Sequence, residues 1–135
     1  MNSDALEDEA AKKIFEGKNF AYVSSLMKDG SPQVTPTWVD IENGYILVNT
    51  AIGRIKQKNI SRDPRVALAI PDQNNPYDMV TIRGKVTEQI TGDLAEQHID
   101  KLAKKYIDKD KFPGRSPREE RIILKIKPER IFHMK

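Results

Sequence analysis

Apolar residues recur along this chain with two periods, one typical of helices and one typical of strands. Near the N-terminus they repeat every three to four residues until Gly17, and Asp4 followed by Glu7 makes a capping-box pattern, which predicts a short amphipathic helix. A second helical stripe follows Thr91, which can cap that helix. The apolar positions of the two stripes are Leu6, Ala10, Ala11, Ile14 and Phe15, and then Leu94, Ala95, His98, Ile99, Leu102, Ala103 and Tyr106.

Apolar runs bounded by turn residues predict six strands. Gly30 marks one turn, and Asn43-Gly44 marks the next, because Asn-Gly tolerates the positive φ angles of a two-residue hairpin. The first three strands are therefore expected to form a meander. We expect Gly84 to mark a bend or bulge and Pro128 to kink the chain after the last strand. The predicted strands are residues 20–26, 33–41, 45–48, 66–70, 79–90 and 121–126.

These elements predict a mainly β (α+β) fold. Strand connections that are nearly all short favour an antiparallel sheet over a parallel, doubly wound one. Six strands with two or three flanking helices are expected to form a small antiparallel β-barrel, with residues 1–135 as a single domain. A barrel of this size is filled by its own side chains, so a sizeable ligand must bind outside it.

A short helical pattern that opens after Gly53 gives the strongest indication of a binding site. It follows an apolar strand, and Asp63-Pro64 ends it because proline disfavours a helical residue before it. The free N–H groups and the dipole of a helix N-terminus favour an anion, and Arg54 and Lys56 can add charge-assisted hydrogen bonds to a phosphate. The structural alternative is a solvated basic surface helix.

Composition narrows the possible chemistry. The chain has no cysteine, which excludes disulfides, a thiolate nucleophile and a cysteine metal site. Its 23 basic and 20 acidic residues leave a net charge of +3, too small by itself to indicate nucleic-acid binding. No apolar run approaches the ~18 residues of a membrane span, and the first residues lack the features of a signal peptide. We therefore expect a cytoplasmic protein.

Side chains with catalytic chemistry of their own are few. His98 and His133 are interpreted as structural, and they are too few and too far apart in sequence to predict a metal site. The serines lack a nearby histidine or the glycines of a nucleophile elbow. The pair Glu119-Glu120 is expected to face solvent. An enzyme of this kind would depend on a cofactor for its chemistry, and no catalytic residue is predicted.

Four segments follow one another in a characteristic order along the chain. They are 29–38, then Asn49-Thr50 with Gly53-Arg54 and Lys56, then Asn59 with Asp63-Pro64-Arg65, and finally Asn75-Pro76-Tyr77 with Arg83-Gly84. In these segments the chain resembles the pyridoxamine 5'-phosphate oxidase-like FMN-binding split barrels and, within them, the branch that binds the deazaflavin coenzyme F420. The resemblance implies a six-stranded split β-barrel that forms homodimers, with the cofactor in a groove between the subunits.

Resemblance and residue chemistry together predict the cofactor-binding residues. The resemblance implies that the strand through Pro36 lies along the cofactor ring, and a proline there removes a ladder donor; the structural alternative is an edge strand with Trp38 in the core. The resemblance also implies that Tyr77 and Met79 cover the ring from the opposite subunit; the structural alternative is that they are ordinary residues at the start of a strand. The full predicted set is Thr35, Pro36, Thr37, Trp38, Asn49, Thr50, Arg54, Lys56, Asn59, Tyr77 and Met79.

Three polar members of this set also have a structural interpretation. Asn49 and Thr50 either hydrogen-bond the ribityl and phosphate oxygens of the cofactor or cap their own strand. Asn59 either donates to the phosphate or ties down its own helix turn.

The resemblance favours a coenzyme F420-dependent oxidoreductase, or F420-binding protein, that transfers a hydride between the reduced deazaflavin and a small organic acceptor. F420 has an acidic glutamyl tail besides its phosphate, and Lys28, Lys58, Arg115 and Arg118 offer further cations for it. The alternative is an FMN-binding oxidoreductase with the same fold. The expected partners are a small-molecule substrate and a second copy of the chain.

A distant alternative is a small barrel that binds single-stranded nucleic acid through strand aromatics and lysines. Phe20, Tyr22, Trp38 and Tyr45 are not interleaved with basic residues on one strand. We therefore expect no nucleic-acid partner, and no membrane partner either.

Overall fold

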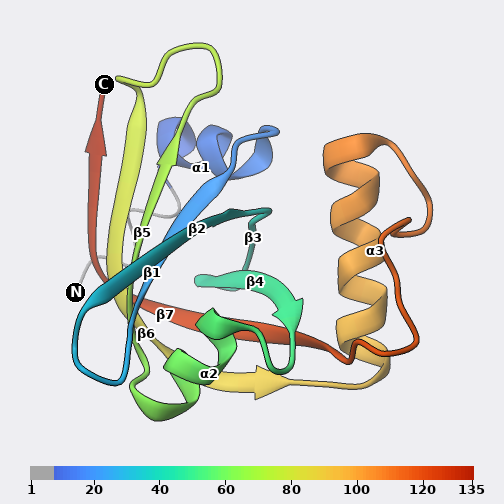
Figure 1. The fold of residues 1–135 in the computed structure, drawn as a ribbon. Coiled ribbons are helices and arrows are strands. Elements are labelled where there is room, and N and C mark those ends of the chain that lie inside the picture. Colours follow the sequence, from blue (N-terminus) through green and yellow to red (C-terminus); the bar gives the residue numbers. More distant parts are fainter. Residues whose placement is uncertain (1–7) are drawn as a thin grey trace.

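The computed structural model describes residues 8–135, which contain three helices and seven strands (Figure 1). The predicted capping residues Asp4 and Glu7, and Leu6, lie outside the described residues. No helix within 8–135 has the length and apolar character needed to cross a membrane. In chain order the elements are α1 (Glu9–Glu16), β1 (Ala21–Leu26), β2 (Pro32–Thr37), β3 (Asp40–Glu42), β4 (Tyr45–Ala51), α2 (Ile55–Arg62), β5 (Arg65–Pro71), β6 (Met79–Ile90), α3 (Asp93–Ile107) and β7 (Arg121–Met134).

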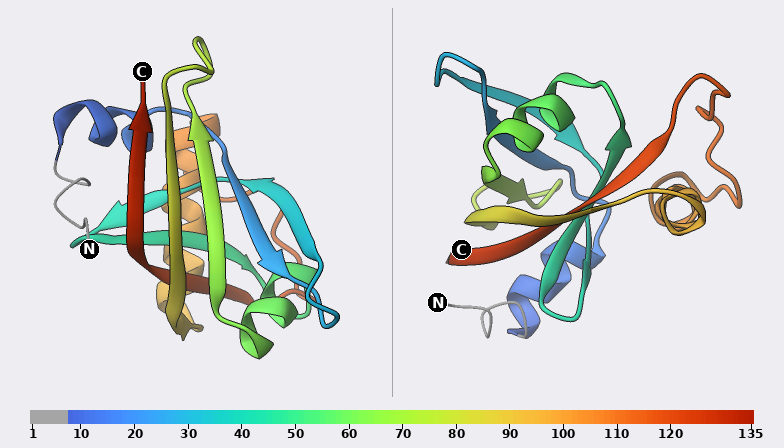
Figure 2. Two further views of the ribbon diagram at one scale, coloured as in Figure 1. Left: turned by 90° about the vertical axis from the view of Figure 1, so that its left-hand side faces the viewer. Right: turned by 90° about the horizontal axis from the view of Figure 1, so that it is seen from below.

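All seven strands belong to one antiparallel sheet with the order β2-β1-β5-β6-β7-β4-β3. The edge strands β2 and β3 are consecutive in the chain, and only Trp38 and Val39 separate them. The sheet therefore curls until its two edges come close, which makes an open, split barrel (Figure 2). The predicted antiparallel split barrel with flanking helices is confirmed, but it has seven strands, not six.

The additional strand arises because the predicted strand 33–41 is divided at Trp38 and Val39. The first part, β2, pairs with β1, whereas β3 pairs with β4 at the other edge of the sheet. The backbone N–H of Val39 donates to the hydroxyl of Tyr106 on α3 over 3.1 Å, so it does not continue a strand ladder. The predicted three-stranded meander is therefore wrong.

The long strands β6 and β7 carry a bulge at Gly84. Their register shifts there, since Gly84 pairs with Pro128 and Glu129 is left as the extra residue. A Cβ atom on Gly84 would lie 2.2 Å from the carbonyl oxygen of Lys127, so this crossing requires glycine. The predicted bulge is confirmed. The predicted kink at Pro128 is the same irregularity, and β7 continues beyond it to Met134.

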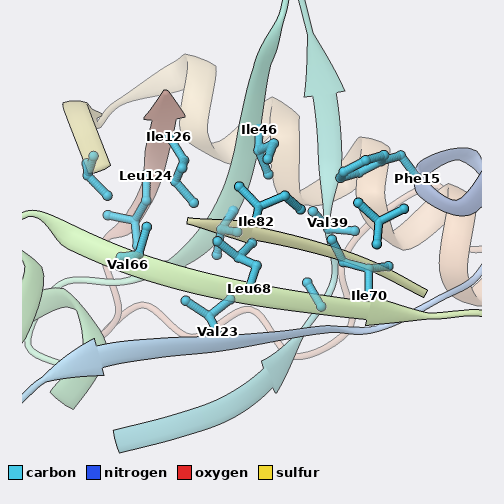
Figure 3. Packing of buried hydrophobic residues seen from close by; sticks show 14 of the residues in the cluster. Phe15, Val23, Val39, Ile46, Val66, Leu68, Ile70, Ile82, Leu124 and Ile126 are labelled. Carbon is cyan, nitrogen blue, oxygen red and sulfur yellow. The ribbon is translucent and has the colours of Figure 1, made fainter. Parts of the chain in front are cut away.

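The core fills the inside of the barrel and is closed at one end by α1 (Figure 3). Its side chains come from α1, from Ile60 on α2 and from strands on every side of the barrel, and each is less than a tenth exposed. The predicted apolar face of α1 is confirmed at Ala11, Ile14 and Phe15. The residues labelled in Figure 3 are Phe15, Val23, Val39, Ile46, Val66, Leu68, Ile70, Ile82, Leu124 and Ile126.

Helix α3 stands outside the barrel and packs against β4 and β7 (Figure 1). It is capped by Gly92, whose φ of +82° suits glycine, and not by Thr91 as predicted. The predicted apolar face is buried except for Leu94, which is 62% exposed. At 100° per residue, Leu94 falls at the margin of a face centred near Leu102 and Tyr106.

Candidate functional site

A groove of about 230 Å³ lies where β2 and β4 end and α2 begins. Most of the predicted cofactor-binding residues line it, although they come from separate parts of the chain. Residues of α3, of the loop after α3 and of the start of β7 complete its wall. The lining comprises Phe20, Pro36, Thr37, Trp38, Asn49, Thr50, Arg54, Lys56, Ile99, Phe112 and Arg121.

The chain around the start of α2 has the predicted order of a strand, a glycine turn and a helix. Strand β4 runs to Ala51 rather than to Val48, so Asn49 and Thr50 lie within its ladder with β7. Gly53 then turns the chain with φ +94°. The helix begins at Ile55 and ends before Asp63. It has no side-chain cap, so N–H groups of its first turn remain free for a ligand.

Lys56 is the clearest sign of an anion site in this groove. Its side chain is buried, 9% exposed, yet it has no hydrogen-bond or ion-pair partner among residues 8–135. Burial lowers the pKa of its ammonium group, and the nearby charges of Arg54 and Arg121 lower it further. Buried polar groups nearly always have partners, and the partner that three clustered cations can share is an anion.

Glu119 neutralises part of this cationic cluster. Its carboxylate accepts from Arg54 Nη2 over 2.6 Å and lies 3.5 Å from Arg121 Nη1. The hydrogen bond from Arg54 lowers the pKa of Glu119 despite partial burial. Glu120 is exposed as expected. Glu119 faces solvent only in part, since its side chain is 28% exposed and a fold that places β7 beside the β4–α2 turn brings its carboxylate to Arg54.

Asn49 is fully engaged within the protein. Its amide nitrogen donates to the carbonyl of Ala95 over 2.9 Å and to Nδ1 of His98 over 3.2 Å. Its amide oxygen accepts from Arg121 Nε over 3.0 Å. Both donor hydrogens of the amide are therefore used, and Asn49 orients Arg121 towards the groove that both residues line.

Behind Asn49, the chain of hydrogen bonds ends in a carboxylate. His98 Nε2 lies 3.2 Å from Asp40 Oδ2, and Lys101 Nζ lies 3.0 Å from the same atom. Burial opposes ionisation of Asp40, but the hydrogen bonds from His98 and Lys101 outweigh it and lower its pKa to about 2. The position of His98 agrees with its interpretation as a structural residue, since the ring is buried and its hydrogen bonds link α3 to β3 and β4.

An aromatic stack forms the other wall of the groove. Trp38 stacks on Tyr106 with ring centroids 5.2 Å apart and meets the edge of Phe112 at 5.9 Å. Phe20 stacks near Tyr106 at 6.1 Å. Pro36 lies on β2, an edge strand, as the structural alternative for this segment supposed. Trp38 is half-buried, so it serves both the packing of α3 and the groove lining.

Two predicted site residues lie near the groove segments without lining the groove. Asn59 is buried and bonds Ser25 Oγ over 3.1 Å, while its oxygen accepts from Arg62 over 2.8 Å. The bond with Arg62 matches the structural alternative for Asn59, in which it ties down its own helix turn, and the bond with Ser25 also ties α2 to β1. The hydroxyl of Thr35 is buried and has no hydrogen-bond partner among residues 8–135. The cofactor contacts predicted for both residues stay predictions.

Tyr77 and Met79 lie away from the groove of their own chain. Tyr77 is 77% exposed in the β5–β6 loop, and Met79 begins β6. Figure 1 shows this loop and α2 at opposite ends of the molecule. These residues can reach a groove only in a second copy of the chain, so their contribution from the opposite subunit stays a prediction.

Sequence reasoning missed four lining residues, namely Phe20, Ile99, Phe112 and Arg121. Only Arg121 gives a local signal, because it directly precedes the apolar run Ile122-Ile123-Leu124. In the described part of the chain, no three His, Asp or Glu side chains converge in a way that could hold a metal ion.

Several solved structures have a fold similar to that of this chain. A solved structure named F420 reductase has a TM-score of 0.78, 24% identity, and coverage of 90% of this chain and 94% of its own. The conserved hypothetical protein Rv2991 of Mycobacterium tuberculosis has a TM-score of 0.73 and 16% identity, with coverage of 100% and 84%. General Stress Protein 26 of Bacillus anthracis has a TM-score of 0.66 and 16% identity, with coverage of 96% and 94%.

These identities show a shared fold. Among curated proteins, none matches this chain. The decisive finding is the family model for pyridoxamine 5'-phosphate oxidase, which matches residues 7–135 and so includes every strand and helix of the barrel. The chain therefore belongs to the pyridoxamine 5'-phosphate oxidase family.

Proposed function

We propose that this protein is an oxidoreductase that uses coenzyme F420 and binds it in the groove at the start of α2. The observation that carries the proposal is the mostly buried side chain of Lys56, which lines the groove, has no partner among residues 8–135 and lies with Arg54 and Arg121 beside the free N–H groups of α2. This arrangement suits a phosphate. The adjoining wall of Pro36 and Trp38 suits a flat ring.

The groove residues would act by binding and positioning. Bound F420 supplies a two-electron hydride carrier, which this chain's own side chains do not offer. Lys56, Arg54 and Arg121 would hold the phosphate, and Thr50 would contact the chain between phosphate and ring. The edge of β2 would support the ring and keep water from one of its faces, so that a small organic acceptor can stack on the other.

Support for F420 over FMN comes from two sources. One is the fold shared with an F420 reductase. The other is a set of exposed cations without ion-pair partners among residues 8–135, Lys28, Lys58 and Arg118, which can attract an acidic tail. Arg115, also predicted for this role, is already held by Glu96 and Asp100 on α3, at 3.0 and 3.1 Å.

The cofactor assignment is tested by titrating the protein with F420 of increasing tail length and with FMN, at low and at physiological salt. We expect F420 to bind more tightly, with an affinity that rises with tail glutamates and falls with salt, because exposed charge pairs are screened within about 8 Å at physiological ionic strength. Lys58→Gln should reduce the difference in binding affinity between F420 and FMN, whereas Lys13→Gln on α1 should leave this difference unchanged. Tighter FMN binding at every salt concentration would establish the FMN alternative instead.

We propose that the protein acts as a homodimer, because one chain offers too small a site. The groove of about 230 Å³ is below the roughly 300–1,000 Å³ of typical cofactor pockets. The outer faces of β1, β5, β6 and β7 carry two adjoining grooves of about 750 and 670 Å³. Tyr22, Val34 and Phe132 line the second of these and are 43%, 60% and 64% exposed. Such a patch suits a second copy.

The Phe132→Glu variant tests this dimer. Light scattering of the wild-type protein should give about twice the monomer mass of 15.4 kDa, and Phe132→Glu should shift the mass towards the monomer and weaken cofactor binding. Leu94→Glu is the matched control, because Leu94 is equally exposed, at 62%, but lies on α3. A wild-type monomer that binds the cofactor tightly would contradict the proposal.

A further inference from the structure

Glu119 occupies the place where a ligand anion would meet Arg54. Its carboxylate bridges Arg54 Nη2 at 2.6 Å and Arg121 Nη1 at 3.5 Å. Among residues 8–135 it is the only carboxylate within ion-pair distance of either arginine. Arg54 and Arg121 both line the groove, together with Lys56, which has no partner of its own.

Arg121 is held rigidly in this position. Its side chain is 7% exposed, its Nε donates to Asn49, and its guanidinium lies 5.1 Å from the ring of Phe112. Asn49 is fixed in turn by His98, which lies against Asp40. These contacts fix the orientation of the Arg121 guanidinium group, whose Nη1 lies towards Glu119 and which lines the groove.

The backbone around Glu119 is fixed, whereas its side chain is not enclosed. The N–H of Glu119 donates to Ser116 over 3.0 Å, and the carbonyl of Glu120 accepts from Ile52 over 2.9 Å. The Glu119 side chain is 28% exposed and that of Arg54 is 54% exposed. The carboxylate can therefore leave Arg54 by side-chain rotation alone, with no change in β7 or in the β4–α2 turn.

We propose that Glu119 is the resident anion of the site formed by Arg54, Lys56 and Arg121, and that the phosphate displaces it from Arg54 when the ligand binds. This inference rests on the proposed function for the identity of the ligand. Its physical basis is competition, because a carboxylate and the anionic phosphate of a ligand cannot share Arg54 and Arg121 at contact distance without strong repulsion. Glu119 thus selects ligands whose anionic group binds Arg54 and Arg121 more tightly than its own carboxylate does.

Glu119→Gln provides the test, because it keeps the size and hydrogen bonding of the side chain and removes its charge. Glu120→Gln is the matched control, since it removes the neighbouring charge from an exposed side chain. The probes are FMN, riboflavin, which lacks the phosphate, F420, and inorganic phosphate. Binding of the flavin and deazaflavin probes is followed by quenching of Trp38, which is the only tryptophan of the chain and lines the groove, and binding of inorganic phosphate is followed by calorimetric titration.

We expect Glu119→Gln to bind F420, FMN and inorganic phosphate roughly three- to tenfold more tightly than the wild type. Riboflavin affinity should be unchanged, and Glu120→Gln should behave as the wild type towards every probe. Equal affinities in the wild type and Glu119→Gln, or weaker phosphate binding in Glu119→Gln, would overturn the inference, since a carboxylate that orients Arg54 for the ligand would give the weaker binding.

The same titrations separate this inference from the proposed function. Tighter inorganic phosphate binding in Glu119→Gln, with no binding of F420 or FMN to either protein, would retain the displaced carboxylate and reject the proposed cofactor. Tight F420 binding that is identical in both proteins would retain the proposed function and reject the role of Glu119.

Discussion

Replacing Lys56 by methionine should weaken binding of a phosphate-bearing cofactor roughly ten- to a hundredfold. The expected loss corresponds to one charge-assisted contact, about 1.5–3 kcal/mol. Methionine keeps most of the apolar stem, which is buried beside Asn59 and Ile60 in the helix, so the packing of α2 should persist. Fluorescence or calorimetric titration with F420 and FMN measures the effect.

The stability of the free Lys56→Met protein adds an independent readout. Without a ligand, burial and the charges of Arg54 and Arg121 disfavour the Lys56 ammonium group. Because the pKa of Lys56 is lower in the folded protein than in the unfolded chain, the charged form costs stability below the folded pKa, and this cost disappears as the pH rises. Thermal unfolding at neutral pH should therefore show the ligand-free variant to be at least as stable as the wild type.

The control for this prediction is Lys58→Met on the exposed side of the same helix. It should leave FMN affinity almost unchanged, since Lys58 does not line the groove. Equal loss of FMN affinity in both variants would mean that α2 contributes only general positive charge, which is the solvated-helix interpretation of the segment.

Features that depend on neighbouring residues could be predicted from the sequence. Helix α2 has the predicted start after Gly53 and the predicted end before Asp63-Pro64, because a positive φ angle and a proline act on their immediate neighbours. The bulge at Gly84 follows from the same kind of local constraint. Arg54 and Lys56 therefore lie at the N-terminus of a helix, as the pattern indicated.

Features that depend on distant residues could not be predicted in this way. The break between β2 and β3 requires Tyr106, which accepts from Val39 across 67 positions of the chain. Glu119 meets Arg54 across 65 positions, and Arg121 meets Asn49 across 72. None of these contacts leaves a periodic pattern in the sequence. The sequence therefore does not predict that Glu119 pairs with Arg54, or that Arg121 lies beside Arg54 and Lys56 in the candidate phosphate site.

Replacing Gly84 by alanine should destabilise the fold by about 3 kcal/mol or more. The new Cβ would lie 2.2 Å from the carbonyl oxygen of Lys127 and 3.2 Å from Cα of Pro128. Both atoms belong to the backbone of β7, which also pairs with β4, so neither can move without disturbing the centre of the sheet. For a chain of 135 residues, a loss of this size lowers the midpoint of thermal unfolding by about 10 °C.

Lys85→Ala is the matched control, because Lys85 follows Gly84 on β6 and its side chain is 49% exposed. Among residues 8–135 its only ion pair is a 3.7 Å contact with the equally exposed Glu129, and such pairs contribute about 0–1 kcal/mol. Calorimetry or circular dichroism should therefore show a large shift for Gly84→Ala and a small one for Lys85→Ala. An unchanged midpoint for Gly84→Ala would mean that β6 and β7 separate at the bulge without cost. The barrel would then not depend on their close crossing.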